Sequence, residues 1–269
     1  MSDGFMTAVA AVANALFLLG ALYVYLSLAR QIAARHDGPV AELGRGFGWP
    51  DAILAFGLAA LFTLNAATSG QSGKVVLHSN DLIINGLVSA GLFVFVAIFL
   101  KLRGRDLNSL AGFSKLGLWR TLTTGALLLL AAYPLILVAD LLTQRILGGS
   151  SSKQGIVELF NDSQTLQQRV LIIILAVAVA PIVEEFVFRF YLYGVLKRYF
   201  GRFAGLVTNS LLFAAVHAHA PSAAPLFVLG VCFTIAYEWS GSILVSMTMH
   251  ALFNSLTLTA LAFPDLLQP

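Results

Sequence analysis

Residues 170–200 read VLIIILAVAVAPIVEEFVFRFYLYGVLKRYF, an apolar run with two adjacent glutamates and an arginine near its middle. A helix needs about 20 residues to cross the ~30 Å of hydrocarbon in a bilayer. The stretch reaches that length only if Glu184, Glu185 and Arg189 enter the membrane with it. Because ionisable groups are costly inside a bilayer, they usually mark a functional site. The segment therefore predicts a membrane-spanning helix that carries such a site.

The rest of the chain has the same apolar character. Of its 269 residues, 58% are hydrophobic and 11% are charged, whereas an average soluble domain has roughly 25% charged residues. Uncharged runs cover 4–29, 52–73, 82–100, 121–139, 203–237 and 239–264, and the run 203–237 is divided by Pro221 and Pro225 into two spans. Barrel strands would instead show ~10-residue alternating segments. We expect an all-α polytopic bundle of about eight transmembrane helices.

The basic residues follow the loops of this predicted topology. When loops alternate between the two sides, one side receives eleven Lys and Arg, the other four, and Arg189 is intramembrane. The positive-inside rule makes the first side cytoplasmic and leaves both termini outside. The composition is typical of a bacterial inner-membrane protein, with the lipid bilayer as partner and no nucleic acid. The eleven are Arg30, Arg35, Arg45, Lys101, Arg103, Arg105, Lys115, Arg120, Lys197, Arg198 and Arg202, and the four are Lys74, Arg145, Lys153 and Arg169.

The chain has no soluble segment long enough to fold alone. We expect a single integral membrane domain over 1–269, with a motif-bearing core at about 165–260. Three short patterns lie in that core: Glu184-Glu185-x-x-x-Arg189, Phe213-x-x-x-His217 and His250-x-x-x-Asn254.

The first pattern separates the two glutamates on a helix. Glu185 and Arg189 are four residues apart and share a face, whereas Glu184 is rotated by ~100°. This spacing predicts a structural ion pair between Glu185 and Arg189, with Glu184 free to act as a base. Whether Glu185 shares that role is left open, because adjacent acids can titrate as a pair.

The other two patterns bring further polar groups to single helix faces. Phe213 and His217 share one face, and so do His250 and Asn254, while His219 is expected to point elsewhere. Histidine exchanges protons near pH 7, and an asparagine amide can donate to a developing oxyanion. Acids, arginine and histidines in three spans are a sufficient set for activating water inside a membrane.

Two other classes of function remain open. A proton-coupled transporter would also place such residues in the membrane, although no inverted repeat is detectable. A non-catalytic immunity or scaffold protein would keep the bundle but would be expected to lose a motif residue, and none is missing.

Together, the three motifs resemble those of the CPBP family, the CAAX proteases and bacteriocin-processing enzymes also called Abi proteins, which include the type II CAAX prenyl endopeptidases. The resemblance covers roughly residues 170–255. It implies an intramembrane endopeptidase in which Glu184 and His217 activate a water while His250 and Asn254 stabilise the oxyanion, with Glu185, Arg189 and Phe213 in support.

The resemblance also bears on cofactor and substrate. We prefer a mechanism without a metal, and the alternative is a zinc metalloprotease with Glu184, His217 and His250 as ligands, since two histidines and a carboxylate can hold zinc. The expected substrate is a membrane-associated or lipidated peptide or protein.

Overall fold

The computed structural model describes residues 3–35, 46–69, 79–107, 111–113, 115–147, 160, 163 and 165–263. Within these ranges all regular elements are helices and no strand occurs. The first four long helices are α1 (Asp3–Ala34), α3 (Trp49–Ser69), α4 (Ser79–Leu102) and α6 (Leu118–Leu147). They are followed by α8 (Leu166–Ile174), η1 (Leu175–Val179), α9 (Ala180–Glu184), η2 (Glu185–Leu192), α10 (Tyr193–Val216), η3 (Ala220–Ser222), α11 (Ala223–Ser240) and α12 (Ile243–Ala262).

Seven of the described helices are long and apolar enough to cross a membrane. The longest of them, 166–216, is interrupted at Gly201, whose φ of 82° and ψ of 171° are not helical. Its two parts are the fifth and sixth spans expected from the sequence. The chain is thus an all-α polytopic membrane bundle, as predicted.

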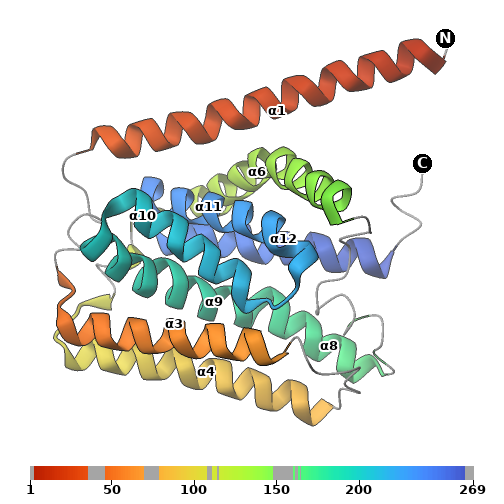
Figure 1. Cartoon of the computed structure of the whole chain (residues 1–269). Coiled ribbons are helices and arrows are strands. Elements are labelled where there is room, and N and C mark those ends of the chain that lie inside the picture. The colour runs from red at the N-terminus through yellow and green to blue at the C-terminus, as the bar shows by residue number, and fades with distance from the viewer. Residues whose placement is uncertain are drawn as a thin grey trace.

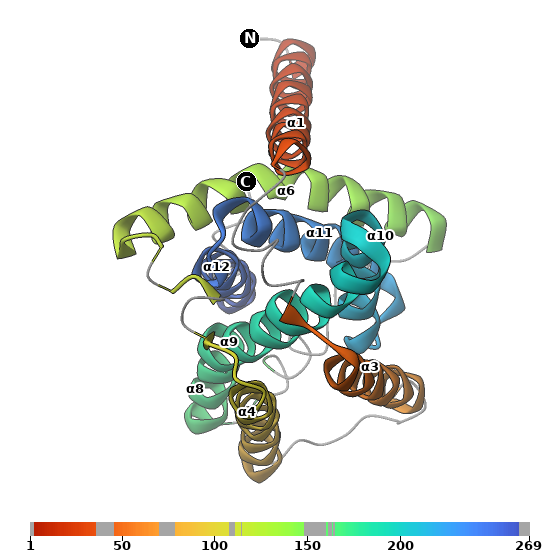
Figure 2. The ribbon, with the colours of Figure 1, turned by 90° about the vertical axis from the view of Figure 1, so that its left-hand side faces the viewer.

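The helix that carries the glutamates lies inside this bundle. Figure 2 looks along the bundle and shows α9 and α10–α12 in its interior, with α6 across one side and α3 and α4 on the other. Helix α6 packs against α11 and α12. Helix α1 lies outside α6 and diverges from the bundle toward its N-terminal end (Figure 1). It is held by Tyr25, whose hydroxyl donates to the Leu128 carbonyl at 2.8 Å.

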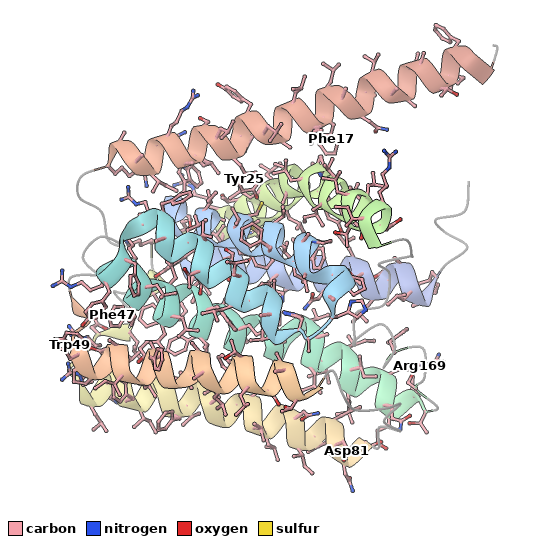
Figure 3. All side chains as sticks on the ribbon, in the orientation of Figure 1. Phe17, Tyr25, Phe47, Trp49, Asp81 and Arg169 are labelled. Atoms are coloured by element: carbon pink, nitrogen blue, oxygen red, sulfur yellow. The ribbon has the colours of Figure 1, made fainter. Side chains whose placement is uncertain are left out.

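The ends of the helices define two faces of the molecule. Phe47 and Trp49 lie at one end of the bundle, and Asp81 and Arg169 lie at the other (Figure 3). Helix α1 begins and α12 ends at the end with Asp81 (Figure 1). The side of the membrane that each face occupies stays a prediction. Arg45, Lys74 and Lys153, three of the basic residues behind it, lie outside the described residues.

Local signals explain where several of these helices begin and end. Thr165 caps α8 in a capping box, because its side chain accepts from the Gln168 backbone and the Gln168 side chain accepts from the Thr165 backbone. Helix α11 ends at Ser240 and is capped by Gly241, whose positive φ of 68° suits glycine. Pro221 lies in η3, between α10 and α11, where the sequence predicted a division.

The core is built around η2. Its fully buried side chains include Arg189, Phe186, Phe190 and Tyr191. On the outside, α1 and α3 expose large apolar side chains such as Leu16 and Phe56, and in a membrane such surfaces contact lipid. The bundle therefore combines a lipid-facing exterior with an interior that includes a buried arginine.

Candidate active site

A cavity of about 270 Å³ lies where α9, α10, α11 and α12 meet. Four predicted catalytic residues, Glu184, His217, His250 and Asn254, line it. The remaining lining is mostly apolar: Ala176, Ala180, Phe213, Leu226, Leu229, Phe253 and Leu258, with His219 and Thr257 as the other polar residues. Residues from three separate motifs thus share one small, largely apolar space.

The helix that carries Glu184 has two π-helical segments, η1 before it and η2 after it. In η1 the backbone N–H of Ala180 donates to the Leu175 carbonyl, five residues earlier. Such segments are rare and frequently occur at functional sites. The side chain of Asn254 donates from Nδ2 to the Ala176 carbonyl at 2.7 Å. Helix α12 is therefore bonded to the irregular part of the glutamate-bearing helix.

His250 lies between the two glutamates. Its Nδ1 is 3.0 Å from Oε1 of Glu185, and its Nε2 is 3.9 Å from Oε2 of Glu184. Consecutive residues of a helix are rotated by ~100°, and the two acids therefore differ in exposure. The side chain of Glu184 is 29% exposed, whereas that of Glu185 is fully buried. Only Glu184 lines the cavity, although both acids reach the same imidazole ring.

Arg189 is fully buried and forms the predicted pair with Glu185. Its Nε is 3.3 Å from Oε2 of Glu185. Its guanidinium carbon lies 4.1 Å from the ring centroid of Phe213 and 5.3 Å from that of Phe233. A cation over an aromatic face is attracted by the ring quadrupole, and more strongly when both are desolvated. The pair is therefore supported by aromatic rings from two other helices.

Phe213 connects the motifs through its ring. Besides Arg189, it contacts the imidazoles of His217, at 4.9 Å between centroids, and His250, at 6.0 Å. The Phe213 carbonyl is 2.8 Å from Nδ1 of His217. This contact orients the His217 ring and leaves its Nε2 for the cavity. The FxxxH pattern thus supplies a packing centre as well as an imidazole.

The position expected for His219 was wrong. The sequence placed it on another face from His217 because a continuing helix would rotate it away, but His219 lines the same cavity. Helix α10 ends at Val216, and Ala218 has a positive φ of 50°. The helical rotation rule does not apply beyond that point, so both histidines reach one space.

The described residues show no preformed metal site. Among the described residues, no group of three or more His, Cys, Asp and Glu side chains is arranged to hold a metal ion. The zinc alternative with Glu184, His217 and His250 as ligands stays a prediction, as does the mechanism without a metal.

Sequence reasoning missed Phe233. It lies in the apolar run of α11, is fully buried, and its ring centroid is 5.1 Å from that of His250. No motif or polar group marks it among the other apolar residues of α11, so the sequence offered no signal. His219, in contrast, had a visible signal as the second histidine of His217-Ala218-His219.

Comparison with known proteins bears on the same part of the chain. Residues 166–256 match the family model described as type II CAAX prenyl endopeptidase Rce1-like. No curated protein and no solved structure matches the chain significantly. The matched segment contains all three motifs and all of the cavity lining except Thr257 and Leu258. Residues 166–256 are therefore similar to the Rce1-like type II CAAX prenyl endopeptidases, and this similarity supports a membrane protease of that kind.

Proposed function

We propose that this protein hydrolyses a peptide bond of a membrane-associated or lipidated peptide, with Glu184 as the base. Glu184 takes a proton from a water held with the help of His217. The water oxygen then bonds to the carbonyl carbon. His250 and Asn254 donate to the resulting oxyanion, and the carbon–nitrogen bond breaks as the leaving nitrogen takes the proton from Glu184.

The observation that carries this assignment is the position of Glu184. Among the described residues it is the only acid that lines the cavity, which it shares with His217, His250 and Asn254. The general-base role requires a carboxylate that a water molecule can reach. Its side chain is 29% exposed, whereas Glu185 is fully buried against Arg189. We therefore assign Glu185, Arg189 and Phe213 to support of the site.

Asn254 can serve both its observed contact and the proposed one. An asparagine amide has two N–H donors, and one is directed at the Ala176 carbonyl. The other can point toward an oxyanion in the cavity. The contact with Ala176 would then hold the amide in place before the substrate arrives.

The test is proteolysis by the purified protein in liposomes against a panel of membrane-anchored and lipidated peptides. We expect Glu184→Gln to lower the cleavage rate by about 100-fold or more, in the range typical of general base catalysis. The matched control is Asp140→Asn, which removes an acid of α6 that does not line the cavity and should leave cleavage intact.

Metal content is measured on the same active sample. We expect activity without stoichiometric zinc. Cleavage that survives in Glu184→Gln would refute the assignment of the base. One zinc per active chain, lost together with activity and restored with it, would favour the metalloprotease instead.

A further inference from the structure

His219 is the ionisable side chain of the cavity that the proposed mechanism does not use. Its Nδ1 lies 2.8 Å from Oγ of Ser222, a residue that is 4% exposed. This hydrogen bond occupies one ring nitrogen and fixes the ring against η3. The other nitrogen, Nε2, remains for a contact within the cavity that His219 lines.

The backbone that places His219 there is unusual. Ala218 has a φ of 50°, the only positive φ of a non-glycine residue in the described part of the chain. An L-residue pays a steric cost in that region, and such residues cluster at functional sites. The conformation turns the chain between His217 and His219 so that both side chains line one cavity. Hence the strain is directly linked to the position of His219.

A peptide substrate brings polar backbone groups into this apolar space. Buried N–H and C=O groups without hydrogen bonds cost free energy, and lipid offers them no partner. Seven of the lining residues are apolar, and four of the polar ones have roles in the chemistry. Of the two that remain, Thr257 already donates its hydroxyl to the Phe253 carbonyl at 2.9 Å. His219 is therefore the lining group best able to hydrogen-bond the substrate backbone.

We propose that His219 binds the backbone of the peptide substrate through Nε2 and that Ser222 is the positioning residue for its ring. This inference rests on the proposed function, because it concerns the same cavity and a peptide substrate. It identifies His219 as a substrate-binding residue that determines how the peptide lies across the site.

The experiment is a cycle between enzyme variants and substrate variants. The probe is a palmitoylated, internally quenched peptide that the wild type cleaves in proteoliposomes, with each backbone amide near the cut, except the scissile one, replaced in turn by an ester. An ester removes the N–H donor and weakens the carbonyl acceptor, so it reports either tautomer of His219. We expect one ester position to lower kcat/KM of the wild type by about 3- to 10-fold, the range for one hydrogen bond.

In His219→Phe that ester position should have no further effect on kcat/KM, because the partner is already lost. In Ser222→Ala the ester should lower kcat/KM by a smaller factor than in the wild type. In His219→Gln, whose side chain can still form a hydrogen bond, the ester should again lower kcat/KM, by part of the wild-type factor. If each ester lowers kcat/KM of His219→Phe by the same factor as in the wild type, the two changes are independent and the proposal is overturned.

Two controls make the result of the cycle interpretable. Ser222→Ala and His219→Gln are small changes, so a failure of His219→Phe to fold would still leave two variants for the cycle. If Ser222→Ala and His219→Gln both keep the full ester effect of the wild type, the proposal is also overturned. Glu184→Gln is assayed on the unmodified peptide in parallel, so that an error in the assigned base shows separately from an error about His219.

Discussion

At the residue scale, the site depends on aromatic rings as much as on its polar groups. Phe213 and Phe233 both contact the guanidinium of Arg189 and the imidazole of His250. Neither ring can exchange a proton. In the proposed mechanism, these rings fix the orientation of groups that must be correctly placed before the reaction, and small displacements distant from the reacting atoms can slow catalysis.

Phe233→Leu tests this role. We expect the variant to lose about 1–3 kcal/mol of unfolding free energy because the buried shape changes, and to cleave at least about 10-fold more slowly because the His250 ring is less constrained. Cleavage rate and detergent unfolding are measured on the same preparation.

The matched control is Phe190→Leu. Phe190 is also fully buried, but its ring stacks on Phe186 at 5.1 Å and not on a motif residue. It should lose similar stability and keep its cleavage rate. Equal rate losses in both variants would show that Phe233 acts only through general stability.

At the element scale, the helix 166–216 departs from regular α-helical geometry at three places. It contains the π segments η1 and η2 on either side of Glu184, and its chain turns at Gly201. A π segment changes the rotation between the residues before and after it. The contacts of Asn254 with Ala176 and of His250 with both glutamates depend on that rotation, and an ideal helix drawn from the sequence cannot reproduce them.

Gly201→Ala tests the turn. An added Cβ would meet nothing within 4 Å, so only the backbone conformation is affected. Because the φ of 82° and ψ of 171° lie in a region that essentially only glycine adopts, we expect a loss of about 1–3 kcal/mol in unfolding free energy.

Gly57→Ala is the control for this change. Gly57 is a helical residue of α3 and is equally open. Alanine there should be neutral or should stabilise by up to about 1 kcal/mol. Unfolding in detergent micelles compares the two variants, and equal effects would refute the role of the turn.

At the scale of the whole molecule, ion pairs between described residues lie at the end of the bundle with Trp49. The end with Trp49 includes the Arg103 contact with Asp51, at 3.4 Å, and the ion pair of Arg202 with Glu238, at 2.8 Å. The start of α1 and the end of α12 share the opposite face (Figure 1). Multi-pass insertion follows from the seven apolar helices, and the positive-inside rule predicts their orientation.

Reporter fusions test that orientation. A reporter that is active only outside the cytoplasm should be active at both termini and inactive when inserted after Arg105. A cytoplasmic reporter should give the reverse pattern. The opposite result at all three positions would mean that the bundle is inserted the other way, while a mixture of the two would contradict the even number of spans.

The sequence alone determined the class of fold and the residues of the motifs. Apolar runs of sufficient length must form helices in a bilayer because lipid offers no partner for the backbone, and the spacing of Glu185 and Arg189 follows from helical periodicity. These inferences need only local rules. For the same reason they were wrong for His219, which lies beyond the end of α10, where the periodicity stops.

Only the tertiary structure decided which side chains meet. The two contacts of His250 with the glutamates, the rings of Phe213 and Phe233 over Arg189, and the place of His219 in the cavity all join separate segments of the chain. They depend on how helices pack and on local departures from ideal geometry at η1, η2 and Ala218. Such contacts are set by side-chain packing between helices, which no periodic pattern within a single helix can specify.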